Sequence, residues 1–278
     1  VVRTNHDRLS GDRRISTDLE VSVPRTVALA LEGRYGDFEV RDVAGPLEVS
    51  SANAGVRINN IEKNVRVNLK RSDIVRAIQL KGNIEISGRG QDIELEKVAG
   101  TATINGDFTG VIRLQDLAKP VRYASSRTEL SFEKLPGRLE LDGSSVTVTD
   151  VVGPIRLVEV GQRSRGRDIR IEGFSQALEI SARQGDIELR TSKLPLGNIQ
   201  VTTRHGSIAL EVPGNAQFQI QGRTSHGRAD NQFGSSLKVE EQGKSAAEMS
   251  GGTLSGAKVR LSTDRGDITV RKAGTASV

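Results

Sequence analysis

RYGDFEV (residues 34–40) decides the fold, because its core returns throughout the chain. The similar stretches are GNIEI (82–86), QDIEL (91–95), GDIEL (185–189) and GDITV (266–270). Most copies have a glycine, then an Asn or Asp, and then an apolar–polar–apolar triplet. A catalytic loop normally occurs once, whereas a sequence motif that recurs along the whole chain indicates a repeat architecture.

The triplets form two interleaved series. The polar centres of the first series are Glu39, Arg57, Arg76, Glu94, Arg113, Ser131, Thr147, Arg170 and Glu188. Each member of the second series follows nine residues later, at Glu48, Arg66, Glu85, Thr103, Arg122, Glu140, Arg156 and Glu179. Successive units are mostly 18 or 19 residues apart, with irregular spacing around residues 141–168. A third apolar position, four residues after each first-series centre, predicts an inward corner residue at Val43, Ile61, Leu80, Val98, Leu117, Leu135, Val151 and Phe174.

Alternation with a period of two over three to five residues predicts short strands. Short strands at a constant pitch, separated by polar corners, stack into a parallel β-helix that is right-handed by default. We therefore expect an all-β, single-stranded right-handed parallel β-helix (solenoid) of about ten coils with N- and C-terminal caps. It should form one continuous domain, with cap strands in residues 1–35, coils in 36–212, and final coils with a C-terminal cap in 213–278. We expect two closing strands in AKVRLSTDRGDITV (257–270).

The composition excludes several classes of site. The 278 residues contain no Cys, which excludes disulfides, thiolate zinc sites and cysteine nucleophiles. Forty basic residues face 35 acidic ones, so the surface is mixed and is not that of a polycation. Aromatic residues make up 3% of the chain and Trp is absent, which argues against specific nucleic-acid binding by base stacking. No apolar run is long enough to span a membrane. We expect an export signal or membrane anchor before residue 1, because the chain begins with Val.

Metal and catalytic sites find little support. Calcium-binding β-rolls need the motif G-G-x-G-x-D, which this chain lacks, so we interpret as turn residues the corner carboxylates Asp37, Asp92, Asp168, Asp186 and Asp267. His205 and His226 could stack on neighbouring coils, but two imidazoles without a third ligand make a poor metal site. With His6 as the remaining histidine, a Ser–His–Asp triad has little basis. Most strand-face carboxylates also neighbour a basic or neutral residue. We therefore expect no catalytic residue, no metal and no cofactor.

One edge of the predicted coil is rich in arginine. The loop VEVGQRSRGRD (158–168) is longer than its equivalents, and the corresponding corners carry Lys70, Arg71, Arg89 and Arg127. Guanidinium groups suit bidentate contact with phosphate or carboxylate. We predict an anion-binding edge that includes Arg163, Arg165, Arg167, Arg183 and Arg204. The alternative is an ordinary solvated surface, because acidic neighbours dilute the positive charge.

Five phrases resemble a bacterial adhesin-like β-helix family of unknown function, related to the head-GIN and toast-rack domains. They are RYGDFEV, GNIEISG, SARQGDIEL, VPGNAQFQI followed by RTSHGR, and VRLSTDRGDITV, and the likeness spans roughly residues 19–272. The resemblance implies a β-helical ectodomain in the bacterial envelope, often beside a membrane anchor. It implies no established catalytic motif, so no catalytic residue is carried over.

Our first hypothesis is a non-enzymatic cell-envelope protein, in the periplasm or on the cell surface. It would act as an adhesin or binding scaffold that presents a repetitive charged surface to anionic polysaccharide, lipid headgroups or another envelope protein. One alternative is a β-helical polysaccharide lyase or hydrolase, which needs unpaired carboxylates that converge in a groove. Another is a scaffold that assembles end to end.

Overall fold

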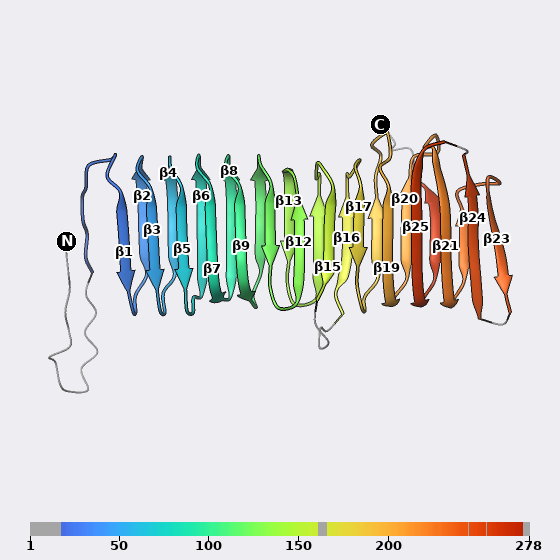
Figure 1. The fold of residues 1–278 in the computed structure, drawn as a ribbon, viewed down its shortest axis with the longest axis horizontal. Coiled ribbons are helices and arrows are strands. Elements are labelled where there is room, and N and C mark those ends of the chain that lie inside the picture. Colours follow the sequence, from blue (N-terminus) through green and yellow to red (C-terminus); the bar gives the residue numbers. More distant parts are fainter. Residues whose placement is uncertain (1–17, 161–165, 244, 254, 275–278) are drawn as a thin grey trace.

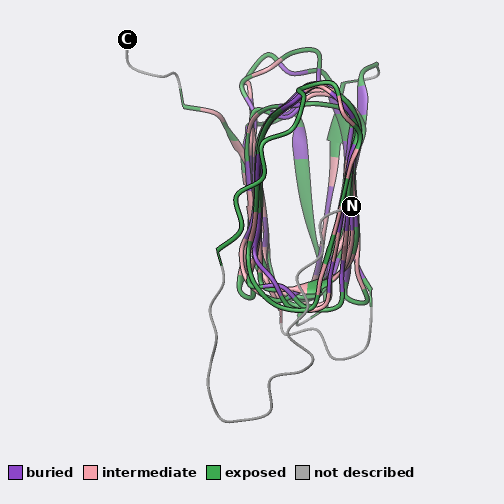
Figure 2. Ribbon diagram, turned by 90° about the vertical axis from the view of Figure 1, so that its left-hand side faces the viewer, coloured by how far each residue is buried: buried purple, intermediate pink, exposed green. Residues whose placement is uncertain are grey.

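The chain forms a flat β-solenoid of about nine turns. The computed structural model describes residues 18–160, 166–243, 245–253 and 255–274. Most turns contribute one strand to each of two facing sheets, which run along the whole rod (Figure 1). Viewed end on, the turns superimpose in a flattened outline whose two long sides are the sheets (Figure 2). Among the described residues, no helix is long and apolar enough to cross a membrane.

We call the two sheets A and B. In spatial order, sheet A contains β1 (Leu29–Gly33), β3 (Leu47–Ser51), β5 (Val65–Leu69), β7 (Ile84–Gly90), β9 (Ala102–Phe108), β11 (Val121–Ala124), β12 (Thr128–Phe132), β15 (Ile155–Glu159), β17 (Leu178–Ser181), β19 (Ile199–His205), β25 (Ala257–Arg265), β21 (Phe218–His226), β24 (Ala246–Gly252) and β23 (Leu237–Gln242). Sheet B contains β2 (Phe38–Val43), β4 (Val56–Ile61), β6 (Ile74–Leu80), β8 (Asp92–Val98), β10 (Ile112–Leu117), β13 (Leu135–Leu141), β14 (Ser145–Thr149), β16 (Asp168–Glu172), β18 (Ile187–Arg190), β20 (Ile208–Val212), β26 (Ile268–Lys272) and β22 (Ala229–Gln232).

The predicted period is confirmed by the register of the strands. Glu48 on β3 pairs with Arg66 on β5, which in turn pairs with Glu85 on β7. The flanking apolar residues point between the sheets, where Val49 and Val67 are fully buried. An extended chain sends alternate side chains to opposite faces, so the triplet buries two residues and exposes the charged one.

The predicted inward corner position is also confirmed. All eight of its residues are buried, with exposures of 3% or less, at Val43, Ile61, Leu80, Val98, Leu117, Leu135, Val151 and Phe174. In six of these coils the preceding residue has a left-handed backbone, with φ between 50° and 60°, at Asp42, Asn60, Gln79, Lys97, Asp116 and Asp150. This residue is skipped in the strand register, as where Arg41 pairs with Asn59 and Val43 with Ile61. The skipped residue turns the strand end so that the next side chain enters the core.

One coil runs backwards, which corrects two positions of the predicted series. Ser131, expected in the first series, lies on β12 in sheet A, and Glu140, expected in the second, lies on β13 in sheet B. Both strands are antiparallel to their neighbours on each side. The chain reverses in a tight turn after β11, where Ser125 Oγ accepts the backbone N–H of Thr128 at 2.9 Å. It reverses again after β13, where Asp142 accepts backbone N–H groups, and β14 and β15 resume the original direction.

The last coil in sequence is not the last in space. The closing strands expected over residues 257–270 are present as β25 and β26, but β25 lies between β19 and β21, and β26 lies between β20 and β22. In Figure 1 the dark red β25 accordingly stands inside the rod. The antiparallel strands β24 and β23 cover the end of sheet A instead.

Candidate functional site

The turns that lead from sheet A into sheet B lie along one edge of the solenoid, because the strands of sheet A are parallel except β12 and β24. We call this line of turns the A-to-B edge. The predicted cations that the structure describes do share this edge; they are Lys70, Arg71, Arg89, Arg127, Arg167, Arg183 and Arg204. Their binding of an anion stays a prediction.

The long arginine loop is only partly described. Arg163 and Arg165 fall in residues 161–165, outside the described part of the chain. Arg167 is half-buried, and its Nη1 donates a hydrogen bond to Thr128 Oγ1 on the reversed strand β12 at 2.7 Å. Arg204, by contrast, is exposed at the end of β19. Arg167 thus contacts the reversed coil just before β16 begins, whereas Arg204 faces solvent.

A buried carboxylate lies beneath the same edge. Glu159 ends β15 and is 9% exposed; its Oε2 accepts the backbone N–H of Arg183 at 3.0 Å. Its Oε1 has no hydrogen-bond partner in the described part of the chain. Burial raises the pKa of Glu159, an effect that Arg167 and Arg183 partly offset. Sequence reasoning missed this residue. Alternate residues of a strand share a face, so the inward positions of Ile155 and Leu157 on β15 already predict an inward side chain at position 159.

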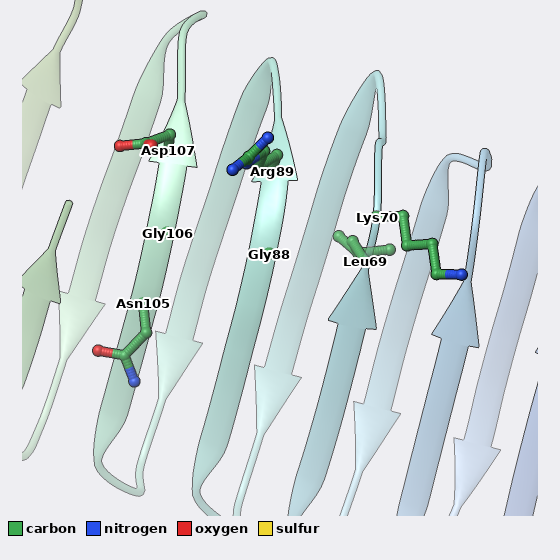
Figure 3. Close-up of a pocket in the computed structure, with 7 residues that line it drawn as sticks. All are labelled: Leu69, Lys70, Gly88, Arg89, Asn105, Gly106 and Asp107. Carbon is green, nitrogen blue, oxygen red and sulfur yellow. The ribbon is translucent and has the colours of Figure 1, made fainter. Parts of the chain in front are cut away.

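A shallow depression of about 610 Å³ opens on sheet A next to the A-to-B edge (Figure 3). Its floor is the backbone of Gly88 on β7 and Gly106 on β9. Both have positive φ, and a Cβ on Gly106 would lie 1.8 Å from the carbonyl oxygen of Gly88. The close stacking of coils therefore requires glycine here, and the missing side chains leave the depression open. Lys70 and Arg89 stand at its rim.

The charges at this rim are not equivalent. Asp107, at the end of β9, accepts the hydroxyl of Ser126 at 2.7 Å and its backbone N–H at 2.9 Å. These bonds lower the pKa of Asp107, and Arg89 and Arg127 add a smaller electrostatic contribution. In the described residues, the side chains of Lys70 and Arg89 make no hydrogen bond or ion pair, so their charges are available to a ligand.

Several charges on the sheet faces are paired instead. Arg66 Nε lies 3.2 Å from Glu85 Oε2 on sheet A. On sheet B the carboxylate of Glu188 contacts guanidinium groups of three coils, those of Arg170, Arg190 and Arg271. Arg170 lies on the neighbouring strand β16, Arg190 on the same strand as Glu188, and Arg271 two strands away on β26. These face charges are therefore engaged with one another, whereas Lys70 and Arg89 have no such partner among the described residues.

The corner carboxylates serve the stacking of the coils. Each accepts a backbone N–H from the next coil in space: Asp37 from Gly55, Asp92 from Val111, Asp168 from Asp186, Asp186 from Ser207 and Asp267 from Arg228. The interpretation of these residues as turn residues gains a physical basis, although the donor belongs to the neighbouring coil. The described residues contain no group of three or more His, Asp or Glu that could hold a metal ion.

The comparison with known families agrees with this geometry. A family model described as Toastrack DUF4097 matches residues 13–271. The chain belongs to the Toastrack family. No curated protein and no solved structure matches it. The Toastrack domain is one of unknown function, so the family assigns no role to any residue described above.

The two described histidines of this Toastrack chain do not stack directly. His205 ends β19 and His226 ends β21, and both pair in register with Arg265 of the inserted strand β25. The expectation of neighbouring coils was therefore wrong, because a later segment of the chain lies between them. His6 lies outside the described residues.

Proposed function

We propose that this Toastrack chain is a non-enzymatic scaffold of the cell envelope that binds anionic polymers along its A-to-B edge. The observation that carries the proposal is the contrast between paired face charges such as Arg66 and Glu85 and the exposed Lys70 and Arg89 beside the depression, which have no ion-pair partner among the described residues. Neighbouring coils are about 4.8 Å apart, so cations that recur on them form a row suited to a linear polymer with repeated carboxylate, sulfate or phosphate groups.

The rigidity of the scaffold supports the same proposal. The backbone of nearly every coil is bonded to a coil on each side, and the corner carboxylates add further bonds between coils. A rigid row of cations loses little conformational entropy when a polymer binds, which favours affinity. We place the protein outside the cytoplasm, in the periplasm or at the cell surface, where such polymers are abundant. The resemblance seen in the sequence supports this location.

Retention on immobilised heparin, lipopolysaccharide or teichoic acid tests the proposal. The triple variant Lys70→Ala, Arg71→Ala and Arg89→Ala should be retained several-fold less than the parent chain at low salt, because exposed charges attract an anionic polymer through solvent. The matched control removes three lysines from the opposite edge, Lys63→Ala, Lys119→Ala and Lys134→Ala, and should change retention much less. If the two variants lost retention equally, net charge alone would explain the binding, which would contradict a site at this edge.

The absence of catalysis is tested separately. The purified chain should leave uronate-containing and sulfated polysaccharides at their original length after prolonged incubation. Release of shortened or unsaturated products would contradict the non-enzymatic part of the proposal and favour a polysaccharide lyase or hydrolase.

A further inference from the structure

The inserted coil joins two parts of the solenoid that are otherwise not hydrogen-bonded in either sheet. On one side Thr202 of β19 pairs with Ser262 of β25, and on the other side Ser262 pairs with Arg223 of β21. In sheet B, Ile268 of β26 pairs with both Ile208 of β20 and Ala229 of β22. Without residues 257–272, a slot one coil wide would separate β19 and β20 from β21 and β22.

The slot holds its coil by apolar burial on both sheets. Val259 and Leu261 of β25 and Ile268 and Val270 of β26 are each 2% exposed or less. All four continue the inward rows of the coils on either side. Burial on this scale is the main driving force for binding an extended segment.

Polar contacts at both edges make this recognition specific. At the start of β25, the backbone N–H of Lys258 donates to Asn198 Oδ1 at 2.8 Å. At its end, Thr263 Oγ1 donates to the carbonyl oxygen of Gly206 at 3.0 Å. On β26, Arg271 Nε donates to Glu211 Oε2 at 2.7 Å. These bonds fix the register of the coil in the slot.

The shape of the slot also selects for glycine at the corner between the two strands. Gly266 has φ of +142°, and a Cβ there would lie 2.2 Å from the carbonyl oxygen of Gly206. The slot therefore recognises a particular sequence, with Gly266 at the corner and apolar residues at fixed positions on both sides.

Four residues connect the inserted coil to the preceding strand β24. Residues 253–256 lead from β24 into β25; Gly252, which ends β24, and Gly256, which directly precedes β25, have positive φ. A coil that inserts between two preformed neighbours is bound on both sides like a ligand, although it belongs to the same chain.

We propose that this slot is a strand-acceptor site for residues 257–272, and that a second copy of the chain can supply them. Copies would then be joined by exchange of the inserted coil. The proposal is independent of the anion-binding edge. It requires only that the coil bind from another chain with the same contacts that it makes from its own.

The tether sets how much exchange to expect. A short linker gives an effective concentration of about 1 mM for the coil of the same chain. At a chain concentration of about 100 µM, about one slot in ten should therefore hold the coil of another copy, and at about 1 µM about one in a thousand. Exchange should depend on concentration and become established while the chain folds.

The absence of Cys allows a direct test on the full chain. One chain carries Thr202→Cys and a second carries Ser262→Cys, two exposed positions paired across β19 and β25. The chains are folded together, by co-expression or from denaturant at about 100 µM, a concentration at which exchange is measurable, and are treated with a short thiol-to-thiol crosslinker. Covalent heterodimer should form and should decline on dilution before folding.

The control pair lies on two coils that are consecutive in the chain. Ser181→Cys and Thr202→Cys are paired across β17 and β19, which exchange of residues 257–272 leaves within one copy. This mixture should give at least about tenfold less heterodimer than the first, as expected if only the last coil exchanges. Equal yields from the two mixtures, or no heterodimer from the first, would overturn the proposal. A single chain carrying both Thr202→Cys and Ser262→Cys should crosslink within itself at low concentration, and its failure to do so would overturn the placement of the coil.

A free peptide tests the acceptor site by itself. A labelled peptide of residues 255–273, present at about 1 mM while the full chain folds, should occupy about half of the slots and remain bound through gel filtration. The control peptide carries Val259→Asp and Leu261→Asp, which place charges at buried positions, and should be lost. Retention of the native peptide at the level of the control would show that the slot does not accept a strand from another molecule.

Discussion

The coils from β2 to β10 and the coils after β11 use the same triplets but connect them differently. In the first region each strand follows the strand 18 or 19 residues before it, always in parallel. In the second region one coil, β12 and β13, runs backwards, and another, β25 and β26, is inserted between earlier coils. Both regions bury the same alternating rows. The triplet therefore specifies a place in the stack, whereas the turns specify direction and order.

The largest effect should come from a glycine that lets two coils of the regular region approach. Gly106→Ala should lower the free energy of unfolding by about 4 kcal/mol, since a positive φ and contact with a backbone oxygen both add strain. The matched control in the reversed region is Gly143, which lies in the turn between β13 and β14 with nothing within 4 Å of an added Cβ. Gly143→Ala should change stability by less than about 0.5 kcal/mol. Urea unfolding measures both, and a similar cost at the two positions would contradict the difference in packing around the two glycines.

A pair of leucines tests whether the reversed coil packs as tightly as the regular one. Leu114 on β10 and Leu139 on β13 pair directly in register, and both are fully buried. Replacement of either by Ala should cost about 3 kcal/mol, because each leaves a cavity in the same row. Urea unfolding midpoints should therefore shift equally. A much smaller cost at Leu139 would mean that the reversed coil is loosely held.

Two corner carboxylates should respond differently to salt. The Arg57 guanidinium, followed by the Gly55 backbone N–H, lowers the pKa of Asp37 in the regular region. For Asp142 in the reversed region, the backbone N–H of Ser144 is the main cause of a lowered pKa. Because both carboxyls are largely exposed, Asp37→Asn and Asp142→Asn should each cost about 1 kcal/mol or less at neutral pH. Added salt should shrink the loss at Asp37, which has a charged partner, more than the loss at Asp142.

The pH dependence of these two positions follows from the direction of their shifts. A carboxyl whose pKa is lowered by folding stabilises the folded state at pH values above its pKa in the unfolded chain, which is about 3.9. That contribution is lost as the pH falls through the lower pKa of the folded state. The difference between the parent chain and either Asn variant should therefore persist down to about pH 4 and disappear in stronger acid. A difference that survives full protonation would have a cause other than the charge.

Much of the fold could be predicted from the sequence because burial leaves a periodic trace. The period, the inward corner residues and the shared edge of the cations all follow from which side chains must avoid water. The direction of a strand cannot be predicted in this way, because the apolar–polar alternation is the same in either direction. Ser131 and Glu140 were therefore assigned to the wrong sheets. The position of the inserted coil could not be predicted either, because β25 and β21 have the same apolar–polar alternation. The left-handed residues Gln79 and Lys97 were also unpredictable, because side chains of these types rarely adopt that conformation.

The sequence predicted where the candidate site lies better than it predicted the contacts of its side chains. A common edge for the cations follows from the period alone, whereas the depression beside Lys70 depends on how closely Gly88 and Gly106 approach. The inward turn of Arg167 toward Thr128 depends on the reversed coil, which the pattern could not show. Long-range contacts of this kind require the order of the coils to be known first.

The smallest expected effect on stability is the difference between an isolated ion pair of the regular region and the ion-pair network around the inserted coil. Arg66 and Glu85 form an exposed pair, with side-chain exposures of 59% and 49%. Arg271 of the inserted coil contacts Glu211 at 2.7 Å and Glu188 at 3.5 Å, and both carboxylates are less than 25% exposed. Arg66→Ala should cost about 0.3 kcal/mol and Arg271→Ala about 1 kcal/mol, because partial burial reduces screening by water and ions. In urea unfolding at high salt the first loss should vanish while part of the second remains. If the two losses were equal at every salt concentration, the network would add nothing beyond single pairs, and the inserted coil would be held by its backbone and apolar contacts alone.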